Sequence, residues 1–295
     1  MARRKETLRR LVAREEVLIL PGVHDALSAR IAEQVGFEAV YMTGSGVSAC
    51  LLGEPDVGLT TMTEMADQAR RIAHAVDVPV IADADTGYGN ALNVIETVHA
   101  YETAGVAGLH IEDQVSPKKC GHFEGKELVS VTEMSGKIRA AVGARKDANF
   151  FVIARTDART VAGLEEAIER GQAYVSAGAD AIFVETPISR EEYSQIADAL
   201  GHVPLVADVT EGGKSPPLTA DELYRAGFKI VLFSASAVRA TMKTLQELYR
   251  TLKRDRTTNG LLHTLVAFEE RNRILGLPEI YDLEHRYAAN VPAPD

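Results

Sequence analysis

The segments AGVAGLHIED (104–113) and AGADAIFVET (177–186) share one sequence pattern, and this pattern decides the fold. In each, a glycine follows a helical stretch, and an apolar run typical of a β-strand begins a few residues later. The pattern recurs in VGFEAVYMTG (35–44) and AGFKIVLFSA (226–235). Glycine after a helix allows the left-handed turn that returns the chain to a sheet. The glycines that we expect to end helices are Gly36, Gly105, Gly178 and Gly227.

Eight apolar runs of this kind recur along the chain. They are VLIL (17–20), AVYMTG (39–44), VPVIADAD (78–85), GLHIED (108–113), FFVIARTD (150–157), AIFVET (181–186), PLVADV (204–209) and IVLFSA (230–235). Intervening segments such as 61–76 and 163–178 have apolar residues three or four apart, which indicates amphipathic helices. Alternating strands and helices predict a parallel sheet, and eight strands favour a closed (β/α)8 TIM-type barrel. A doubly wound sheet is the alternative, but no GxGxxG follows the first strand.

The chain of 295 residues is long enough for such a barrel with an extension. We expect a catalytic barrel domain over residues 1–255 and a C-terminal helical extension over 256–295. The amphipathic segment 261–275 can pack on a neighbouring subunit or on its own barrel.

Composition excludes several classes of function. The formal charge is −10, and the 32 basic residues are scattered, so neither a nucleic acid nor an anionic membrane is an expected partner. No apolar run approaches the roughly 18 residues of a membrane span. The charged start MARRKETLRRLVAREE (1–16) does not resemble a signal peptide, and two cysteines form no disulfide framework. We therefore expect a cytoplasmic protein, with Cys50 buried in an apolar setting.

Polar residues gather where the expected strands end. In a barrel these ends form the active face. Asp83 and Asp85 lie on one face of the third strand, and Glu112 follows on the fourth. Carboxylate oxygens in a hydrated site suit Mg²⁺, with Mn²⁺ also possible. The alternative is that such acids cap the following helices, and for Asp157 this alternative is equally strong.

Other strand ends offer groups that could bind an anion. Arg155 can hold both oxygens of a substrate carboxylate, although it could instead pair with neighbouring acids. The turn 43–46 offers backbone N–H groups and a hydroxyl, which is a weak signal. The loop 208–219, which contains Asp208 and Glu211, could bind the far end of a ligand.

A long polar loop, QVSPKKCGHFEGKELVS (114–130), follows the fourth strand. It brings together Lys118, Cys120 and His122, and loops of this length in a barrel are usually lids or functional elements. The cationic neighbours should lower the thiol pKa and make Cys120 a competent acid or base.

Several of these motifs occur together in one known family. KKCGH (118–122), DADTGYG (83–89), TGSG (43–46), EPDVG (54–58), LHIEDQ (109–114) and ARTDA (154–158) resemble the isocitrate lyase/phosphoenolpyruvate mutase superfamily over residues 17–250. The resemblance implies a Mg²⁺-dependent carbon–carbon lyase that converts a 2-hydroxy di- or tricarboxylate, of the 2-methylisocitrate or 2,3-dimethylmalate type, to pyruvate or a similar α-keto acid plus a dicarboxylate. It also implies a homotetramer with exchanged C-terminal helices.

The resemblance also implies a role for individual residues. Asp85 would be the principal Mg²⁺ ligand, and Asp83, Glu112 and Asp56 would hold the ion largely through water. The keto-acid carboxylate would be held by Thr43, Gly44, Ser45 and Arg155, with support from Glu185. Cys120, with Gly121 and His122 beside it, would protonate the departing carbanion. Arg239 matches an arginine that some members use near the substrate.

One departure from the pattern bears on the substrate. Asp208 stands where the lyases usually have asparagine, and it would repel a distal carboxylate unless it is protonated or turned away. A phosphonomutase of the carboxyphosphonoenolpyruvate type is the first alternative, and it needs no thiol acid. An oxaloacetate decarboxylase and a catalytically silent barrel that binds a metabolite are further alternatives.

Overall fold

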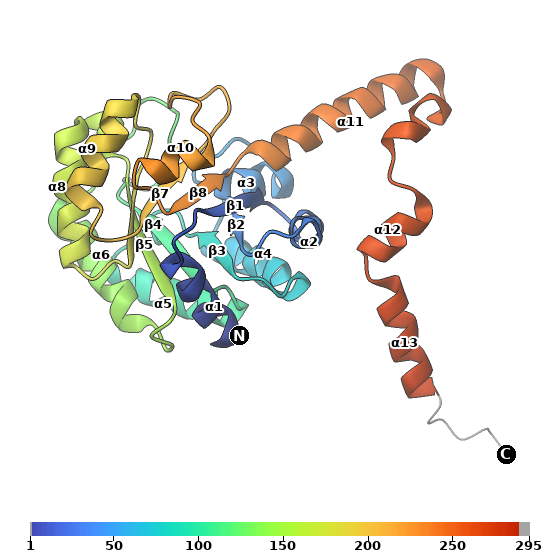
Figure 1. Ribbon diagram of the computed structural model, residues 1–295, viewed down its shortest axis with the longest axis horizontal. Helices are drawn as coiled ribbons and strands as arrows, with labels where there is room; N and C mark the ends of the chain where they lie inside the picture. Colours follow the sequence, from blue (N-terminus) through green and yellow to red (C-terminus); the bar gives the residue numbers. More distant parts are fainter. Residues whose placement is uncertain (1, 289–295) are drawn as a thin grey trace. The chain divides into compact units, whose positions relative to one another are not determined.

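A closed barrel of eight parallel strands, taken in chain order, forms the centre of the first of two compact units (Figure 1). The computed structural model describes residues 2–288. The strands are β1 Leu18–Val23, β2 Val40–Met42, β3 Val80–Asp83, β4 Gly108–Glu112, β5 Phe151–Thr156, β6 Ala181–Val184, β7 Leu205–Asp208 and β8 Ile230–Phe233. Strand β8 pairs with β1, with Leu18 opposite Ile230, and this pairing closes the ring. The predicted (β/α)8 barrel is confirmed, and the doubly wound alternative is excluded.

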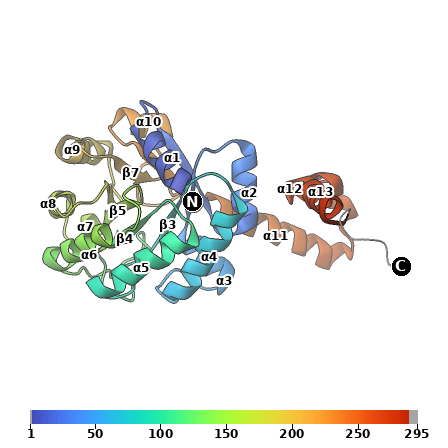
Figure 2. The same ribbon diagram turned by 90° about the horizontal axis from the view of Figure 1, so that it is seen from below.

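Helices connect the strands and cover the outside of the barrel (Figure 2). They are α1 Ala2–Ala13, α2 Ala26–Val35, α3 Gly44–Leu51, α4 Met62–Ala75, α5 Ala91–Ala104, α6 Val131–Ala144, α7 Ala158–Val161, α8 Leu164–Ser176, α9 Arg190–Leu200 and α10 Ala220–Arg225. Helix α4 begins with a capping box between Thr61 and Glu64. The four predicted helix-ending glycines have positive φ angles, for example 105° at Gly36, as the repeated sequence pattern predicted.

Two separate apolar cores stabilise the barrel. One lies between the strands and the surrounding helices. The other contains residues that alternate with those of the first along each strand, such as Tyr41 and Phe183, together with Leu8 and Leu11 of α1. Since Leu8 and Leu11 are almost completely buried in this second core, helix α1 closes one end of the barrel.

Polar contacts show which end α1 closes. The Arg4 guanidinium donates to the carbonyl oxygens of Ala73 at 2.6 Å and Val76 at 2.5 Å, just before β3. Arg9 donates to the carbonyl of Asn149 at 3.1 Å, just before β5. Both contacts lie at the N-terminal ends of strands. The opposite end, where the polar residues were predicted, is therefore left for a site.

A second compact unit begins at Arg239, earlier than the predicted boundary at residue 255, which stays a prediction. It contains most of α11 Ser236–Asp255, the 3₁₀ helix η1 Asn259–Thr264, α12 Phe268–Ile274 and α13 Leu277–Ala288. Among its described residues, 239–288, only Thr251 is buried. Residues 289–295 of the predicted extension lie outside the described part of the chain. Within residues 2–288, none of the helices is long and apolar enough to cross a membrane.

Candidate active site

The strand ends and the loop after β4 enclose a small cavity of about 80 Å³ at the mouth of the barrel. Ten of the predicted site residues line it: Thr43, Ser45, Asp56, Asp83, Cys120, Gly121, His122, Arg155, Glu185 and Asp208. The other lining residues are Tyr41, Phe183, Thr210, Leu232, Ser234 and Ala235. The fold thus brings together side chains that are far apart in the sequence.

Three aspartates and a lysine form a buried cluster on one side of the mouth. The Asp83 carboxylate accepts from the backbone N–H of Asp85 at 2.9 Å and of Gly44 at 3.2 Å. A Cβ on Gly44 would overlap that carboxylate, so the close approach requires glycine. Lys118 Nζ lies 2.6 Å from Asp56 Oδ1 and 2.9 Å from Asp85 Oδ1. Burial raises the pKa of Asp85 to about 6 despite this ammonium group.

Glu112 is the buried acid with the fewest partners. Neither of its carboxylate oxygens has a hydrogen-bond partner within the described residues, and Arg155 Nε lies 3.3 Å from Oε2. Burial raises its pKa well above the usual range. The next residue, Asp113, instead accepts from the hydroxyl of Tyr174 at 2.8 Å and from Arg170 at 3.2 Å. Asp113 is therefore part of the scaffold, whereas Glu112 has an ion-pair partner but no hydrogen bond.

Arg155 lies among three carboxylates. Its Nε and NH2 groups donate to Asp157 at 3.0 and 3.2 Å, NH2 lies 3.6 Å from Glu185, and the guanidinium lies over the ring of Phe183. The alternative prediction that Asp157 caps a helix is wrong. Asp157 precedes α7 but forms no side-chain cap, because its carboxylate is committed to Arg155. Asp157 thus orients the guanidinium that lines the cavity.

The turn 43–46 forms the beginning of helix α3. The Thr43 hydroxyl accepts from the backbone N–H of Gly46 at 3.4 Å and lies 3.2 Å from the Ser45 hydroxyl. Thr43 thus serves as the helix N-cap while it also lines the cavity. The two side chains line the cavity, and anion binding by this turn stays a prediction.

The loop 114–130 places Cys120 against the cavity. The backbone N–H of Cys120 donates to the Asp56 carbonyl at 3.0 Å, and the Gln114 side chain bonds both backbone groups of Lys119 at 2.8 and 2.9 Å. A Cβ on Gly121 would overlap the Glu185 carboxylate, so glycine is needed beside the cysteine. The loop is therefore fixed over the mouth by its backbone as well as by its side chains.

The prediction that neighbouring cations lower the thiol pKa of Cys120 is wrong. Burial, helped by nearby Asp56 and Glu185, raises that pKa to about 11, although the His122 backbone and Arg155 act in the opposite direction. The Lys118 ammonium is 2.6 Å from Asp56 and forms its ion pairs there instead of with the thiol. At neutral pH Cys120 is therefore a protonated thiol. It is a proton donor in its resting state, not a thiolate.

His122, Glu185 and Asp208 form the far wall of the cavity, with one ligand atom of each within 4.8 Å of the others. Asp208 accepts from the hydroxyls of Ser234 and Thr210, both at 2.8 Å. Burial and the nearby Glu185 raise the pKa of Asp208 to about 6, so it is mostly ionised at neutral pH. The wall is acidic, as the departure from asparagine suggested.

The positions of some residues differ from those that the sequence predicted. The prediction that Cys50 is buried is wrong, because it lies on the exposed side of the short helix α3. Glu211 accepts from the Ser236 hydroxyl and does not line the cavity. Arg239 belongs to the second unit, so its predicted contact with substrate stays a prediction.

Sequence reasoning missed Tyr41. Its hydroxyl lies 2.8 Å from His110 Nε2 and 3.5 Å from Asp83 Oδ2. The available signal was alternation: Tyr41 is two residues before Thr43, so both side chains point to the same face of β2 and its continuation. Examination of strand ends alone could not find a residue inside the strand.

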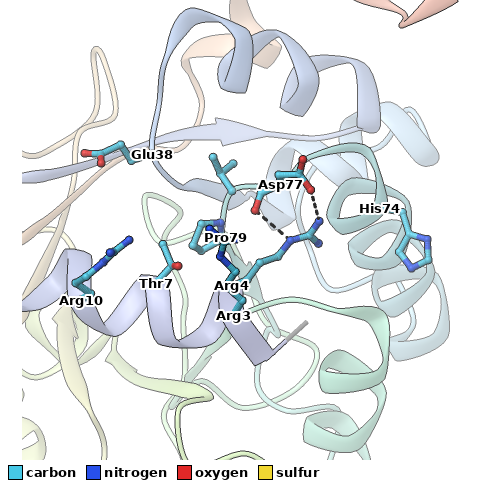
Figure 3. Close-up of a pocket in the computed structure, with 9 residues that line it drawn as sticks. Arg3, Arg4, Thr7, Arg10, Glu38, His74, Asp77 and Pro79 are labelled. Carbon is cyan, nitrogen blue, oxygen red and sulfur yellow. Dashed lines mark hydrogen bonds and ion pairs between the residues drawn. The ribbon is translucent and has the colours of Figure 1, made fainter. Parts of the chain in front are cut away.

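A larger hollow of about 900 Å³ lies beside α1, at the N-terminal ends of the strands (Figure 3). Arg3, Arg10 and His74 line it, and Arg4 points across it to Asp77. The Arg4 contacts described above hold α1 in place, and Asp77 is exposed. The volume of a cavity therefore does not identify the active site, because the active sites of such barrels lie at the C-terminal ends of the strands.

This fold with this mouth defines an enzyme of the isocitrate lyase/phosphoenolpyruvate mutase superfamily. The family described as phosphoenolpyruvate phosphomutase matches residues 8–253. The chain belongs to that family, and the predicted resemblance is confirmed.

Curated relatives include lyases and a mutase. The chain is 49% identical to 2,3-dimethylmalate lyase of Eubacterium barkeri, over 95% of this chain and 97% of that protein. It is 44% identical to 2-methylisocitrate lyase of Aeropyrum pernix, over 95% and 89%. It is 42% identical to the chloroplastic carboxyvinyl-carboxyphosphonate phosphorylmutase of Arabidopsis thaliana, over 97% and 86%.

Solved structures with the same fold cover almost the whole chain. A crystal structure of 2,3-dimethylmalate lyase matches with a TM-score of 0.92 and 38% identity, over 99% of this chain and 98% of that one. Oxaloacetate acetylhydrolase in complex with 3,3-difluorooxalacetate matches at 0.91 and 36%, over 96% and 97%. Phosphonopyruvate hydrolase in complex with oxalate and Mg²⁺ matches at 0.88 and 34%, over 97% and 99%.

Proposed function

We propose that this chain is a divalent-metal-dependent carbon–carbon lyase that cleaves a 2-hydroxydicarboxylate of the 2,3-dimethylmalate type into pyruvate, or a similar α-keto acid, and a second carboxylate. The observation that carries the proposal is that the thiol of Cys120 lines the same small cavity as Arg155; burial raises the thiol pKa to about 11, which favours the protonated form. The cavity thus offers a carboxylate-binding group and a proton donor. The relationship to 2,3-dimethylmalate lyase supports this choice of reaction.

The acidic cluster fits a divalent cation such as Mg²⁺, with Mn²⁺ also suitable. Both oxygens of Glu112 are buried without a hydrogen-bond partner in the described chain, and Asp85 Oδ1 is paired with the Lys118 ammonium at 2.9 Å. Carboxylates of this kind are the hard oxygen donors that these ions prefer. Asp83 and Asp56 would complete the site. When bound, the ion supplies Lewis acidity to the substrate hydroxyl and carboxylate.

The residues of the chain account for the remaining steps. Arg155, with Thr43 and Ser45, binds and orients the carboxylate of the keto-acid half. As the bond between C2 and C3 breaks, the hydroxyl gives its proton to a carboxylate of the acidic cluster and its electron pair forms the C2 carbonyl. The electron pair of the broken bond remains on C3, which takes the proton from Cys120 Sγ. His122 and Glu185 support the loop and the guanidinium beside this centre, and the loop excludes water.

The far wall favours a dicarboxylate over a tricarboxylate. Asp208 and Glu185 lie there together, and the cation beside them, Arg155, is assigned to the keto-acid carboxylate. A third substrate carboxylate would therefore meet acidic groups. The acidic wall therefore disfavours a methylisocitrate-type substrate, although both substrates share the same bond cleavage. The phosphonomutase and oxaloacetate decarboxylase alternatives would use the same metal and Arg155, and differ in their need for Cys120.

A substrate panel with and without metal tests the proposal. The protein is incubated with Mg²⁺ and 2,3-dimethylmalate, 2-methylisocitrate, isocitrate or oxaloacetate, and α-keto acid release is followed. We expect pyruvate from 2,3-dimethylmalate, loss of activity with EDTA and recovery with Mg²⁺ or Mn²⁺. Activity that persists in EDTA would contradict the metal site. Turnover of 2-methylisocitrate in preference to the dicarboxylate would contradict the assignment of the far wall.

We further propose that the chain assembles as a cytoplasmic homotetramer in which the second unit packs on a neighbouring subunit. On α11, Met242, Leu245, Tyr249 and Leu252 are exposed and spaced three or four residues apart, which forms one apolar face. A face of this kind needs a partner surface. Light scattering after size-exclusion chromatography would contradict the assembly if it gave a monomer.

A further inference from the structure

A second lysine of the loop 114–130 is buried, and the reaction proposed above does not use it. Lys126 follows Cys120 by six residues, and only 1% of its side chain is exposed. Its Nζ lies 2.8 Å from Asp157 Oδ1, on a carboxylate that is completely buried. Burying a charged side chain costs free energy, so a buried lysine in this place is expected to have a structural or functional role.

The contacts of Lys126 join two parts of the site. The same Nζ donates to the carbonyl oxygen of Gly121, the residue next to Cys120. Asp157 in turn binds Arg155, and Oδ1 of Asp157 is shared between Lys126 at 2.8 Å and Arg155 NH2 at 3.2 Å. One ammonium group therefore links the chain beside the thiol to the carboxylate that orients the guanidinium.

The other cations in and around the loop do not make this link. Lys119 Nζ donates to the Gly125 carbonyl at 2.6 Å, within the loop itself. Lys214 pairs with Glu124 at the exposed rim. Lys118 binds the Asp56 and Asp85 cluster on the other side of the cavity. Among the described contacts, only Lys126 connects the loop to Asp157.

Sharing Asp157 has a consequence for Arg155. When the loop is in place, the Lys126 ammonium partly neutralises the Asp157 carboxylate. That carboxylate then offsets less of the Arg155 charge, and the electrostatic potential of Arg155 toward the cavity is more positive. When the loop moves away, Asp157 interacts with Arg155 alone and the guanidinium is held more tightly to the scaffold. Loop position and the readiness of Arg155 to bind a carboxylate are then linked.

We propose that Lys126 is a positioning residue that holds the Cys120 loop over the mouth and couples this position to Arg155 through Asp157. The role in holding the loop is independent of the substrate. The role toward Arg155 rests on the proposed function, in which Arg155 binds a carboxylate.

Alkylation of Cys120 tests the loop role without any substrate. In a Cys50→Ser background, which removes the exposed thiol, Lys126→Met is compared with the parent for the rate of reaction with iodoacetamide at pH 8. We expect an increase of about tenfold or more, because a released loop exposes the buried thiol to the reagent. The matched control is Lys119→Met, which removes a charge from the same loop and should change the rate by less than about twofold.

A conservative substitution that keeps the charge distinguishes the positioning role of Lys126 from general destabilisation of the fold. Lys126→Arg keeps the charge and should react within about threefold of the parent rate. Should Lys126→Met fail to fold, Lys126→Gln takes its place and is expected to react several times faster than the parent. A parent-like rate in the neutral variant, or an equal increase in Lys119→Met, would overturn the proposal.

Protection by oxalate tests the link to Arg155. Oxalate with Mg²⁺ is used as the probe, and the concentration that halves the rate of Cys120 alkylation is measured. We expect this concentration to be several times higher in the neutral Lys126 variant than in Lys126→Arg. Equal protection in both variants would overturn the coupling while it leaves the loop role intact. Because alkylation needs no turnover, failure of the substrate panel would not affect the loop result.

Discussion

Replacing Cys120 by alanine is expected to lower kcat by about 10²–10⁴, the usual contribution of a positioned general acid. KM should change by less than about threefold, since the thiol acts on the developing carbanion and Arg155 still binds the carboxylate. The measurement is steady-state pyruvate release from the substrate that the panel identifies, with Mg²⁺ present. Cys50→Ser is the matched control, because it removes the other thiol, which is exposed, and should keep the parent kcat.

The state of the thiol also predicts the pH dependence of this step. Burial raises the Cys120 pKa to about 11, so the proton-donating form is fully present at neutral pH and is lost only as the pH rises through about 11. We expect no decline in kcat from loss of this proton below about pH 10. A kcat that falls with an apparent pKa near 8.5, the value of a free thiol, would contradict a buried donor. Full pyruvate release by Cys120→Ala would mean that another group supplies the proton.

The fold could be predicted because its signals are local. Each unit of the barrel repeats a helix, a glycine and an apolar strand, and positive φ angles at Gly105 and Gly178 follow from the steric freedom of glycine alone. The face that carries the site also follows, because the C-terminal ends of parallel strands share one mouth. Asp83, Glu112 and Arg155 could therefore be placed together before any contact was known.

The protonation states could not be predicted in this way. In the sequence, Lys118 is two residues from Cys120, and this proximity suggested a lowered thiol pKa. In the structure the ammonium is directed to Asp56 and Asp85, and the thiol is left in a buried setting. Sequence distance says nothing about which carboxylate a flexible side chain will reach. The same reasoning applies to Lys126, whose partner Asp157 is 31 residues away.

Replacing Arg155 by methionine should affect stability and activity together. The change removes the cation among Glu112, Asp157 and Glu185, and loss of one partner from a buried ion pair costs about 3–5 kcal/mol of folding free energy. We expect kcat/KM to fall by about 10²–10³ as well, because the bidentate carboxylate clamp is lost. Urea unfolding gives the first quantity and initial rates give the second. Lys126 remains beside Asp157, so part of the buried charge stays balanced.

Two further variants show whether this effect belongs to the site. Arg159→Met removes another arginine with two contacts to one carboxylate, that of Glu192, but on the partly exposed helix α7 outside the cavity. It should cost about 1 kcal/mol or less and leave kcat/KM unchanged. Arg155→Lys keeps the charge without the planar fork, so stability should recover more than activity. Parallel recovery of both would mean that Arg155 supplies only charge, and the carboxylate clamp would have to be assigned to other groups.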